Sequence, residues 1–191
     1  METLTLDVSV LAPLTDEALY QLCVANRELR IERTRDGELI IMSPAGGESS
    51  RRNSLIVAAL VGWNEAAGTG VVFDSSGGFL LPNGAMRAPD AAWVASERWE
   101  RLSDEQRRKF PPLCPDFVVE LMSDTDRLPP LREKLQEWIE NGCRLAWLIA
   151  PEQERAYIYR PGAGPREVPF TESLTGDDVL PGFTLPLEKL R

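Results

Sequence analysis

The most informative segment of this 191-residue chain is Phe117-Val118-Val119-Glu120-Leu121-Met122. Alternate side chains of a strand point to opposite faces of its sheet, so a run that is apolar at odd and even positions predicts a strand covered on both faces. Such a strand lies at the centre of a sheet flanked by helices. Its single carboxylate, Glu120, is costly to bury unless it is paired or holds a cation. The segment therefore predicts both a central strand and a candidate site.

Helix and strand patterns alternate on the C-terminal side of this strand. A helix is predicted over residues 130–141, because Gly142 is a typical helix stop. Strands are predicted over residues 145–149 and 156–159, and residues 161–191 are rich in turn-forming Pro and Gly.

The N-terminal side begins with a helix, for which Thr15 is the expected N-cap. Asp36-Gly37 lies between two strand-like runs, 30–35 and 38–42, and predicts a hairpin. A long helix is predicted over 48–65, strands over 71–73, 79–81 and 91–94, and a polar helix over 103–109. The apolar residues of the long helix recur at helical spacing; they are Leu55, Ile56, Ala59, Leu60 and Trp63. This order predicts an α/β fold with a mixed central sheet flanked by helices.

The length of 191 residues predicts one domain, since domains average roughly 150 residues. We expect an N-terminal helix and hairpin extension at 1–42, a core at 43–160, and C-terminal strands and loops at 161–191.

Charge and composition exclude several function classes. The chain has 30 acidic and 21 basic residues, a net charge of −9, which argues against non-specific coating of nucleic acid or membrane. It contains no histidine, which excludes Ser–His and Cys–His catalytic pairs and most zinc sites. The three scattered cysteines predict reduced thiols, and no apolar run approaches 18 residues. With no signal peptide visible, we expect a cytoplasmic protein.

Two acids stand in segments that otherwise favour apolar residues. Asp90 precedes the strand at 91–94, and Glu120 interrupts the central strand. Two carboxylates on neighbouring strands, with the main-chain carbonyl of Leu121, form a hard-oxygen site suited to Mg²⁺ or Mn²⁺. The alternative is that each acid marks a strand end and is simply solvated.

Two further residues are candidates for the same site. Lys134 flanks the apolar stripe of its helix, from which its ammonium group can reach Glu120; alternatively, its stem covers Trp138. Glu48 projects from the first turn of the long helix toward the core face, as a further metal or water contact. The simpler interpretation of Glu48, which we rank ahead, is an acid that complements the helix dipole.

These residues resemble the PD-(D/E)XK nuclease pattern, and more closely the Uma-type endonucleases. The resemblance runs from about Glu38 to Phe183 and includes Pro89-Asp90, Pro115-Asp116 and residues 117–123, 134–138 and 145–151. It implies a restriction-endonuclease-like fold, Asp90 and Glu120 as metal ligands, and Mg²⁺-dependent phosphodiester cleavage by an activated water. Met122 stands where the motif has lysine, and Lys134 matches a lysine that Uma-type sequences carry on the following helix.

The resemblance implies nucleic acid, most simply DNA, as the partner. Arg51 and Arg52, which begin the helix carrying Glu48, are the preferred phosphate contacts. We expect the aromatic and leucine-rich strands near the C-terminus to be exposed, which favours a homodimer. The alternative function is a degenerate nuclease fold that acts as a binding or interaction module, which Met122 favours and which the retention of Asp90, Glu120 and Lys134 opposes.

Overall fold

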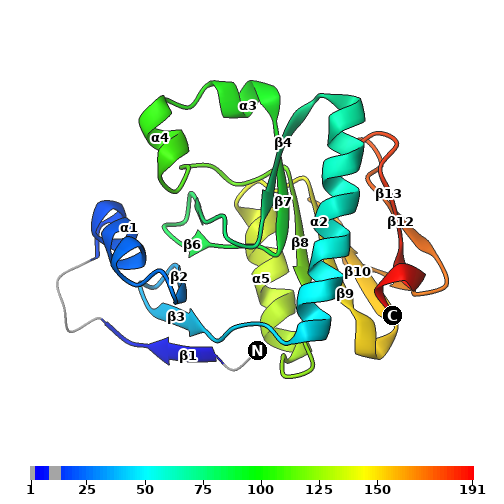
Figure 1. The fold of residues 1–191 in the computed structure, drawn as a ribbon, viewed down its shortest axis with the longest axis horizontal. Coiled ribbons are helices and arrows are strands. Elements are labelled where there is room, and N and C mark those ends of the chain that lie inside the picture. The colour runs from blue at the N-terminus through cyan, green and yellow to red at the C-terminus, as the bar shows by residue number, and fades with distance from the viewer. Residues whose placement is uncertain (1–2, 9–13) are drawn as a thin grey trace.

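A mixed six-stranded sheet forms the centre of the protein (Figure 1). The computed structural model describes residues 3–8 and 14–191. The order of the strands is β11 (Arg166–Pro169), β10 (Arg155–Tyr159), β9 (Leu145–Ala150), β8 (Phe117–Leu121), β7 (Ala91–Ala95) and β4 (Gly70–Asp74). Only the neighbours β8 and β9 run parallel, and the other pairs are antiparallel. The prediction of a mixed sheet with a doubly covered central strand is confirmed.

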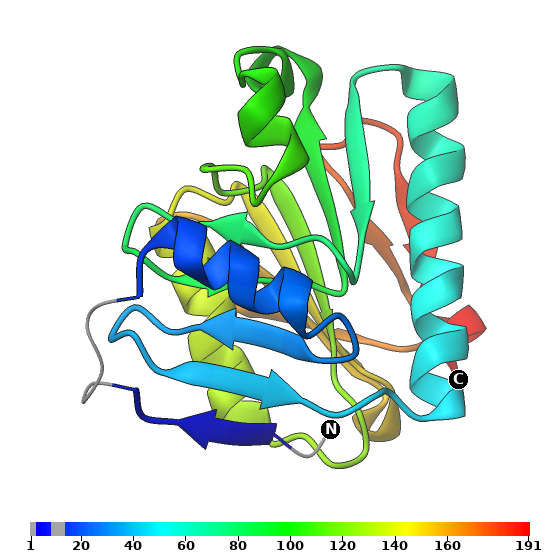
Figure 2. The same ribbon diagram turned by 60° about the vertical axis from the view of Figure 1, so that its left-hand side comes forward.

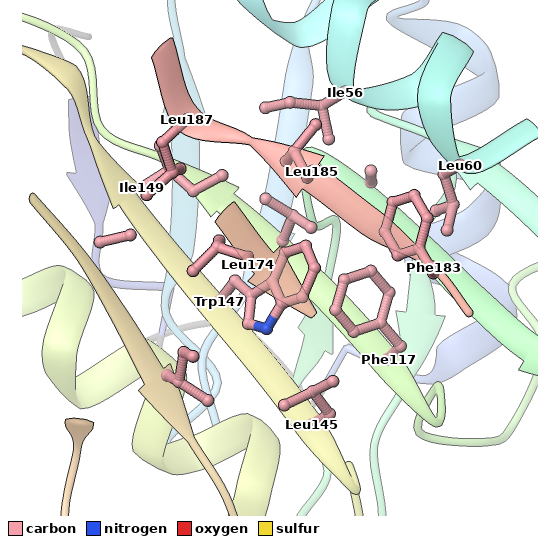
Figure 3. Close-up of a cluster of buried hydrophobic side chains, with 14 of the residues drawn as sticks. Ile56, Leu60, Phe117, Leu145, Trp147, Ile149, Leu174, Phe183, Leu185 and Leu187 are labelled. Carbon is pink, nitrogen blue, oxygen red and sulfur yellow. The ribbon is translucent and has the colours of Figure 1, made fainter. Parts of the chain in front are cut away.

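Helices cover both faces of this sheet (Figure 1). One face packs against α2 (Gly47–Ala67) and the hairpin of β12 (Ser173–Thr175) and β13 (Thr184–Pro186). The other packs against α5 (Leu128–Glu140). Figure 3 shows the first of these cores, where Trp147 stacks on Phe183 with ring centroids 5.7 Å apart.

The alternation of side chains along β8 positions the candidate site. Phe117, Val119 and Leu121 belong to the core under α2, whereas Val118 belongs to the core under α5. Glu120 has the same parity as Val118 and therefore points toward α5. Asp90 directly precedes β7, and its amide donates to the carbonyl of Val119 at 3.0 Å.

A second, five-stranded sheet has the order β1 (Thr3–Leu6), β3 (Leu39–Met42), β2 (Arg30–Arg33), β6 (Met86–Arg87) and β5 (Phe79–Leu80). The predicted hairpin is confirmed as β2 and β3, with Gly37 in the left-handed region at φ +89°. One face of this sheet packs against α1 (Asp16–Ala25), in which Leu19 is fully buried. The other face is turned toward α5 (Figure 2). Because β2 pairs with β6, the N-terminal segment is continuous with the core.

The remaining elements are short and follow local sequence signals. They are α3 (Ser96–Glu100), α4 (Asp104–Arg108) and the 3-10 turns η1 (Pro151–Gln153) and η2 (Leu187–Leu190). Ser103 and Gln106 form a capping box at the start of α4, and Thr15 caps α1 as predicted. No helix in the part of the chain that is described is long and apolar enough to span a membrane.

Two expectations about apolar residues differ from the structure. Leu55, predicted on the buried stripe of α2, is 38% exposed, because the helix rests on the sheet through Ile56 and Leu60 instead. The aromatic and leucine side chains near the C-terminus are buried, since β12, β13 and η2 fold under α2. They are Phe170, Leu174, Leu180, Phe183, Leu185, Leu187 and Leu190. These residues therefore provide no dimer surface.

Candidate active site

A cleft of about 940 Å³ lies between the five-stranded sheet and α5. Strands β1, β2 and β3 contribute one wall through Thr5, Arg30, Glu32, Ile40 and Met42. Helix α5 and the loop before it contribute the other wall. Asp90, Glu120 and Leu121, from the facing ends of β7 and β8, also line the cleft. The two acids singled out by sequence therefore meet in one concave site, which is the usual setting for a ligand.

Glu120 is almost fully buried and makes three contacts with α5. Its Oε1 accepts a hydrogen bond of 2.8 Å from Trp138 Nε1. Lys134 Nζ lies 3.0 Å from Oε1 and 3.1 Å from Oε2. Burial raises the pKa of Glu120 to about 7; the negative charges of Asp90 and Glu32 also raise it, against the opposing effect of Lys134. Burial and the two neighbouring carboxylates thus raise the free energy of the ionised form of Glu120.

Lys134 bridges two strands of different sheets. Its ammonium nitrogen donates to Glu32 Oε1 at 2.9 Å as well as to Glu120. Burial alone would lower the pKa of Lys134, but Glu120 and Glu32 raise it above its ordinary value. The ammonium group is therefore held charged at the base of the cleft. The prediction that this side chain reaches Glu120 from its helix agrees with these distances.

Glu32 is a residue of this site that the sequence analysis did not identify. It is 2% exposed on β2, where Oε1 accepts from the amide of Ala88 at 3.0 Å and Oε2 pairs with Arg87 Nη1 at 3.1 Å. Burial would raise the pKa of Glu32, yet Lys134 and Arg87 lower it below its ordinary value. Its partners are 56 and 102 residues away in the chain, so no local pattern could reveal the cluster.

Asp90 ties the ends of β7 and β8 together. Its Oδ2 accepts a hydrogen bond of 2.8 Å from the amide of Leu121, and its Oδ1 lies 3.5 Å from Arg30 Nη1. The Arg30 guanidinium also donates to the carbonyl of Ala88 at 3.2 Å, while its buried Nε has no partner in the described structure. Of the two carboxylate oxygens of Asp90, Oδ2 thus makes a short hydrogen bond, whereas Oδ1 makes only a longer contact with Arg30.

Comparison with known proteins identifies the family and the fold of the chain. A sequence profile of the family Uma2, described as "Putative restriction endonuclease", matches residues 16–188. The chain belongs to the Uma2 family.

Among solved structures, the chain is similar to one described as "a putative nuclease belonging to DUF820" from Anabaena variabilis ATCC 29413. The TM-score is 0.72 at 16% identity, over 84% of this chain and 88% of that one. At this identity the likeness shows the fold, which is restriction-endonuclease-like. No match was found among curated proteins.

Three of the predicted functional residues of this Uma2 chain lie outside the cleft. Glu48, in the first turn of α2, is exposed and pairs with Arg51 at 2.9 Å. Arg51 also donates to the main-chain carbonyl of Arg191, and Arg52 is buried against Glu152 at 3.0 Å. None of the three is among the residues that line the cleft. The cations that do line it are Arg30, Arg35, Arg87, Arg127 and Lys134.

The donor chemistry of the cleft suits a hard divalent cation. Its lining contains seven acidic and five basic side chains, so the acidic residues are in excess by two. Asp90 and Glu120, with the carbonyl of Leu121, offer only oxygen ligands, the type that Mg²⁺ and Mn²⁺ prefer. In the described ranges, no group of three or more His, Cys, Asp or Glu side chains is arranged to hold a metal ion. The candidate ligand set is therefore limited to two carboxylates and main-chain oxygen.

Met122, at the position of the motif lysine, is not part of the cleft lining. Strand β8 ends at Leu121, and the sulfur of Met122 contacts Gln153 Nε2 at 3.7 Å. The cation beside Glu120 is the ammonium of Lys134, 3.0 Å from its Oε1. In this chain the lysine nearest to Glu120 therefore comes from α5 and not from the end of β8.

Proposed function

We propose that this Uma2 protein is a metal-dependent endonuclease that hydrolyses phosphodiester bonds of DNA. The observation that carries the proposal is the convergence of Asp90, Glu120 and Lys134, from three elements, at the base of one cleft. The excess of acidic over basic side chains in the cleft and the membership of a family described as "Putative restriction endonuclease" support it.

Asp90, Glu120 and the carbonyl of Leu121 would hold the cation. When bound, Mg²⁺ would supply positive charge at the scissile phosphate and make an attacking water more acidic. Lys134 would stabilise the negative charge that develops on a phosphoryl oxygen; the position of its ammonium group beside Glu120 supports this role. Glu32 and Arg87 position Lys134 and act through it.

Phosphate contacts are proposed at Arg35 and Arg127 instead of Arg51 and Arg52. Both line the cleft and both are exposed. Arg35 has only a weak pairing of 3.8 Å with Asp36, so its guanidinium is available to a phosphate at little cost. Because acids outnumber cations in the cleft, we expect DNA to bind well only when the cation is present.

The second candidate function is a binding module that has lost turnover. The specific observation in its favour is Met122, which can neither orient a water nor stabilise charge. This candidate predicts metal-dependent DNA binding without cleavage.

A cleavage assay tests the proposal. Supercoiled plasmid and single-stranded DNA would be incubated with the protein in Mg²⁺, Mn²⁺ or EDTA. We expect metal-dependent nicking that falls by at least about 100-fold in Asp90→Asn and in Glu120→Gln. The matched control is Glu97→Gln, which neutralises an exposed carboxylate on α3 and should retain wild-type activity.

Cleavage that persists in EDTA, or that Asp90→Asn and Glu120→Gln leave intact, would contradict the proposed nuclease centre. DNA binding without nicking would favour the second candidate function, a binding module that has lost turnover.

A further inference from the structure

The outward face of α2 is unusually free of charge. Residues 53–64 include no Asp, Glu, Lys or Arg, although a helix that rests one face on a sheet normally presents charged residues on the other. Leu55 and Val61 are 38% and 40% exposed, and a Cβ added at Gly62 would meet nothing within 4 Å. Figure 2 shows α2 along the outside of the molecule. No described segment of this chain covers that face.

The exposed residues of this face form a pattern that is symmetric about Ala58. Seven residues at helical spacing are all exposed: Arg51, Ser54, Leu55, Ala58, Val61, Gly62 and Glu65. A two-fold axis through Ala58, perpendicular to the helix, places Leu55 opposite the partner's Val61 and Ser54 opposite the partner's Gly62. It also places Arg51 opposite the partner's Glu65. One helix therefore complements a second, antiparallel copy of itself, as an isologous interface requires.

The charges at the two ends of the outward face of α2 favour an antiparallel second copy as its partner. Glu65 lies in the last turn of α2, where a negative charge opposes the helix dipole and where α2 has no basic residue. Arg51 lies near the opposite end, which disfavours cations. In the described structure Glu65 has no ion-pair partner, whereas Arg51 pairs with Glu48 and donates to the carbonyl of Arg191 while its side chain stays 44% exposed. An antiparallel second copy supplies each with an opposite charge.

We propose that the protein forms a homodimer through α2, with the two helices antiparallel and crossing at Ala58. Ala58 and Gly62 allow the axes to approach to about 8 Å, and Leu55 and Val61 then lose their exposure to water. Stable interfaces bury about 800 Å² on each partner, and one helix pair supplies less than that. The dimer is therefore weak.

This arrangement does not depend on the nuclease proposal. Helices α2 and α5 cover opposite faces of the central sheet (Figure 1), and it is α5 that lines the candidate active-site cleft. Both clefts stay open in the dimer.

Sedimentation equilibrium of the full chain tests the interface. Wild type is expected to dimerise with increasing concentration, and Ala58→Arg, which puts two arginines on the axis, to stay monomeric up to about 500 µM. Arg51→Glu and Glu65→Arg are each expected to weaken the dimer about tenfold, because two ion pairs become like-charge contacts. The double variant Arg51→Glu/Glu65→Arg restores it to within about threefold of wild type.

Thermal unfolding of each variant verifies folding, and Leu6→Lys, on the exposed edge strand β1, is the matched control. A wild-type chain that stays monomeric at 500 µM overturns the proposal. So does a dimer that Ala58→Arg leaves intact, a dimer that Leu6→Lys abolishes, or a double variant no better than the single ones.

Discussion

The ionisation of Glu120 links the stability of the fold to the function proposed for it. The pKa of this carboxyl is raised from its ordinary 4.5 to about 7, so the folded protein holds a proton that the unfolded chain releases near pH 4.5. A group whose pKa is raised by folding stabilises the folded state at low pH. That contribution disappears as the pH rises from about 4.5 to 7. A bound cation would offset this loss by stabilising the ionised form.

The first prediction concerns pH. Because a metal must displace the proton of Glu120, the affinity for Mn²⁺ should fall about tenfold for each unit below pH 7 and level off above it. Calorimetric titration between pH 5.5 and 8.5 measures this. Glu120→Gln should remove most of the affinity and its pH dependence, and an affinity that does not change with pH would show that Glu120 is not a ligand.

The second prediction concerns Glu48, which the sequence offered as a catalytic candidate. Its carboxylate is exposed and paired with Arg51 outside the cleft, so Glu48→Gln should leave nicking near the wild-type rate. The stability should change by no more than about 0.5 kcal/mol, as for most surface substitutions. If Glu48→Gln lowered the nicking rate by about tenfold or more while the fold stayed intact, Glu48 would have to be assigned to the active site.

Structural features that are determined by residues close together in the sequence could be predicted from it. The hairpin follows from Asp36-Gly37, and the orientation of Glu120 follows from alternation along β8. The association of Glu32 with Lys134 could not be predicted, because it depends on how the five-stranded sheet docks beside α5. The exposure of Leu55 could not be predicted either, because it depends on how α2 packs on the central sheet. Periodicity gives the width of an apolar stripe, whereas packing decides which part of that stripe touches the sheet.

The third prediction concerns the contact between β2, β6 and α5. Arg87 pairs with Glu32 at 3.1 Å and with Glu137 at 2.6 Å, and all three side chains are largely buried. Arg87→Met leaves two buried carboxylates short of a cation, which should cost about 3–5 kcal/mol of unfolding free energy. Urea denaturation measures this, with Arg35→Met as the exposed control. A loss below about 1 kcal/mol would mean that solvent reaches this contact.

At the scale of the whole molecule, the net charge of −9 restricts how DNA can bind. Long-range electrostatics disfavour the phosphate backbone, so binding must depend on the cleft cations and the metal. The fourth prediction is that Arg35→Gln/Arg127→Gln weakens DNA binding and reduces the slope of log K against log salt by about 2. Fluorescence anisotropy at several salt concentrations measures the slope. The corresponding Arg51→Gln/Arg52→Gln variant should leave the slope unchanged, and the opposite result would place DNA over the start of α2.

The most direct test of the metal-dependent centre is a crystal structure with Mn²⁺, using its anomalous scattering. We predict one strong peak in the cleft, within about 2.0–2.3 Å of carboxylate oxygens of Asp90 and Glu120 and of the Leu121 carbonyl. The peak should be absent from crystals of Glu120→Gln. A cleft without a peak at saturating Mn²⁺, or a peak held by other residues, would contradict the assignment of Asp90 and Glu120 as metal ligands.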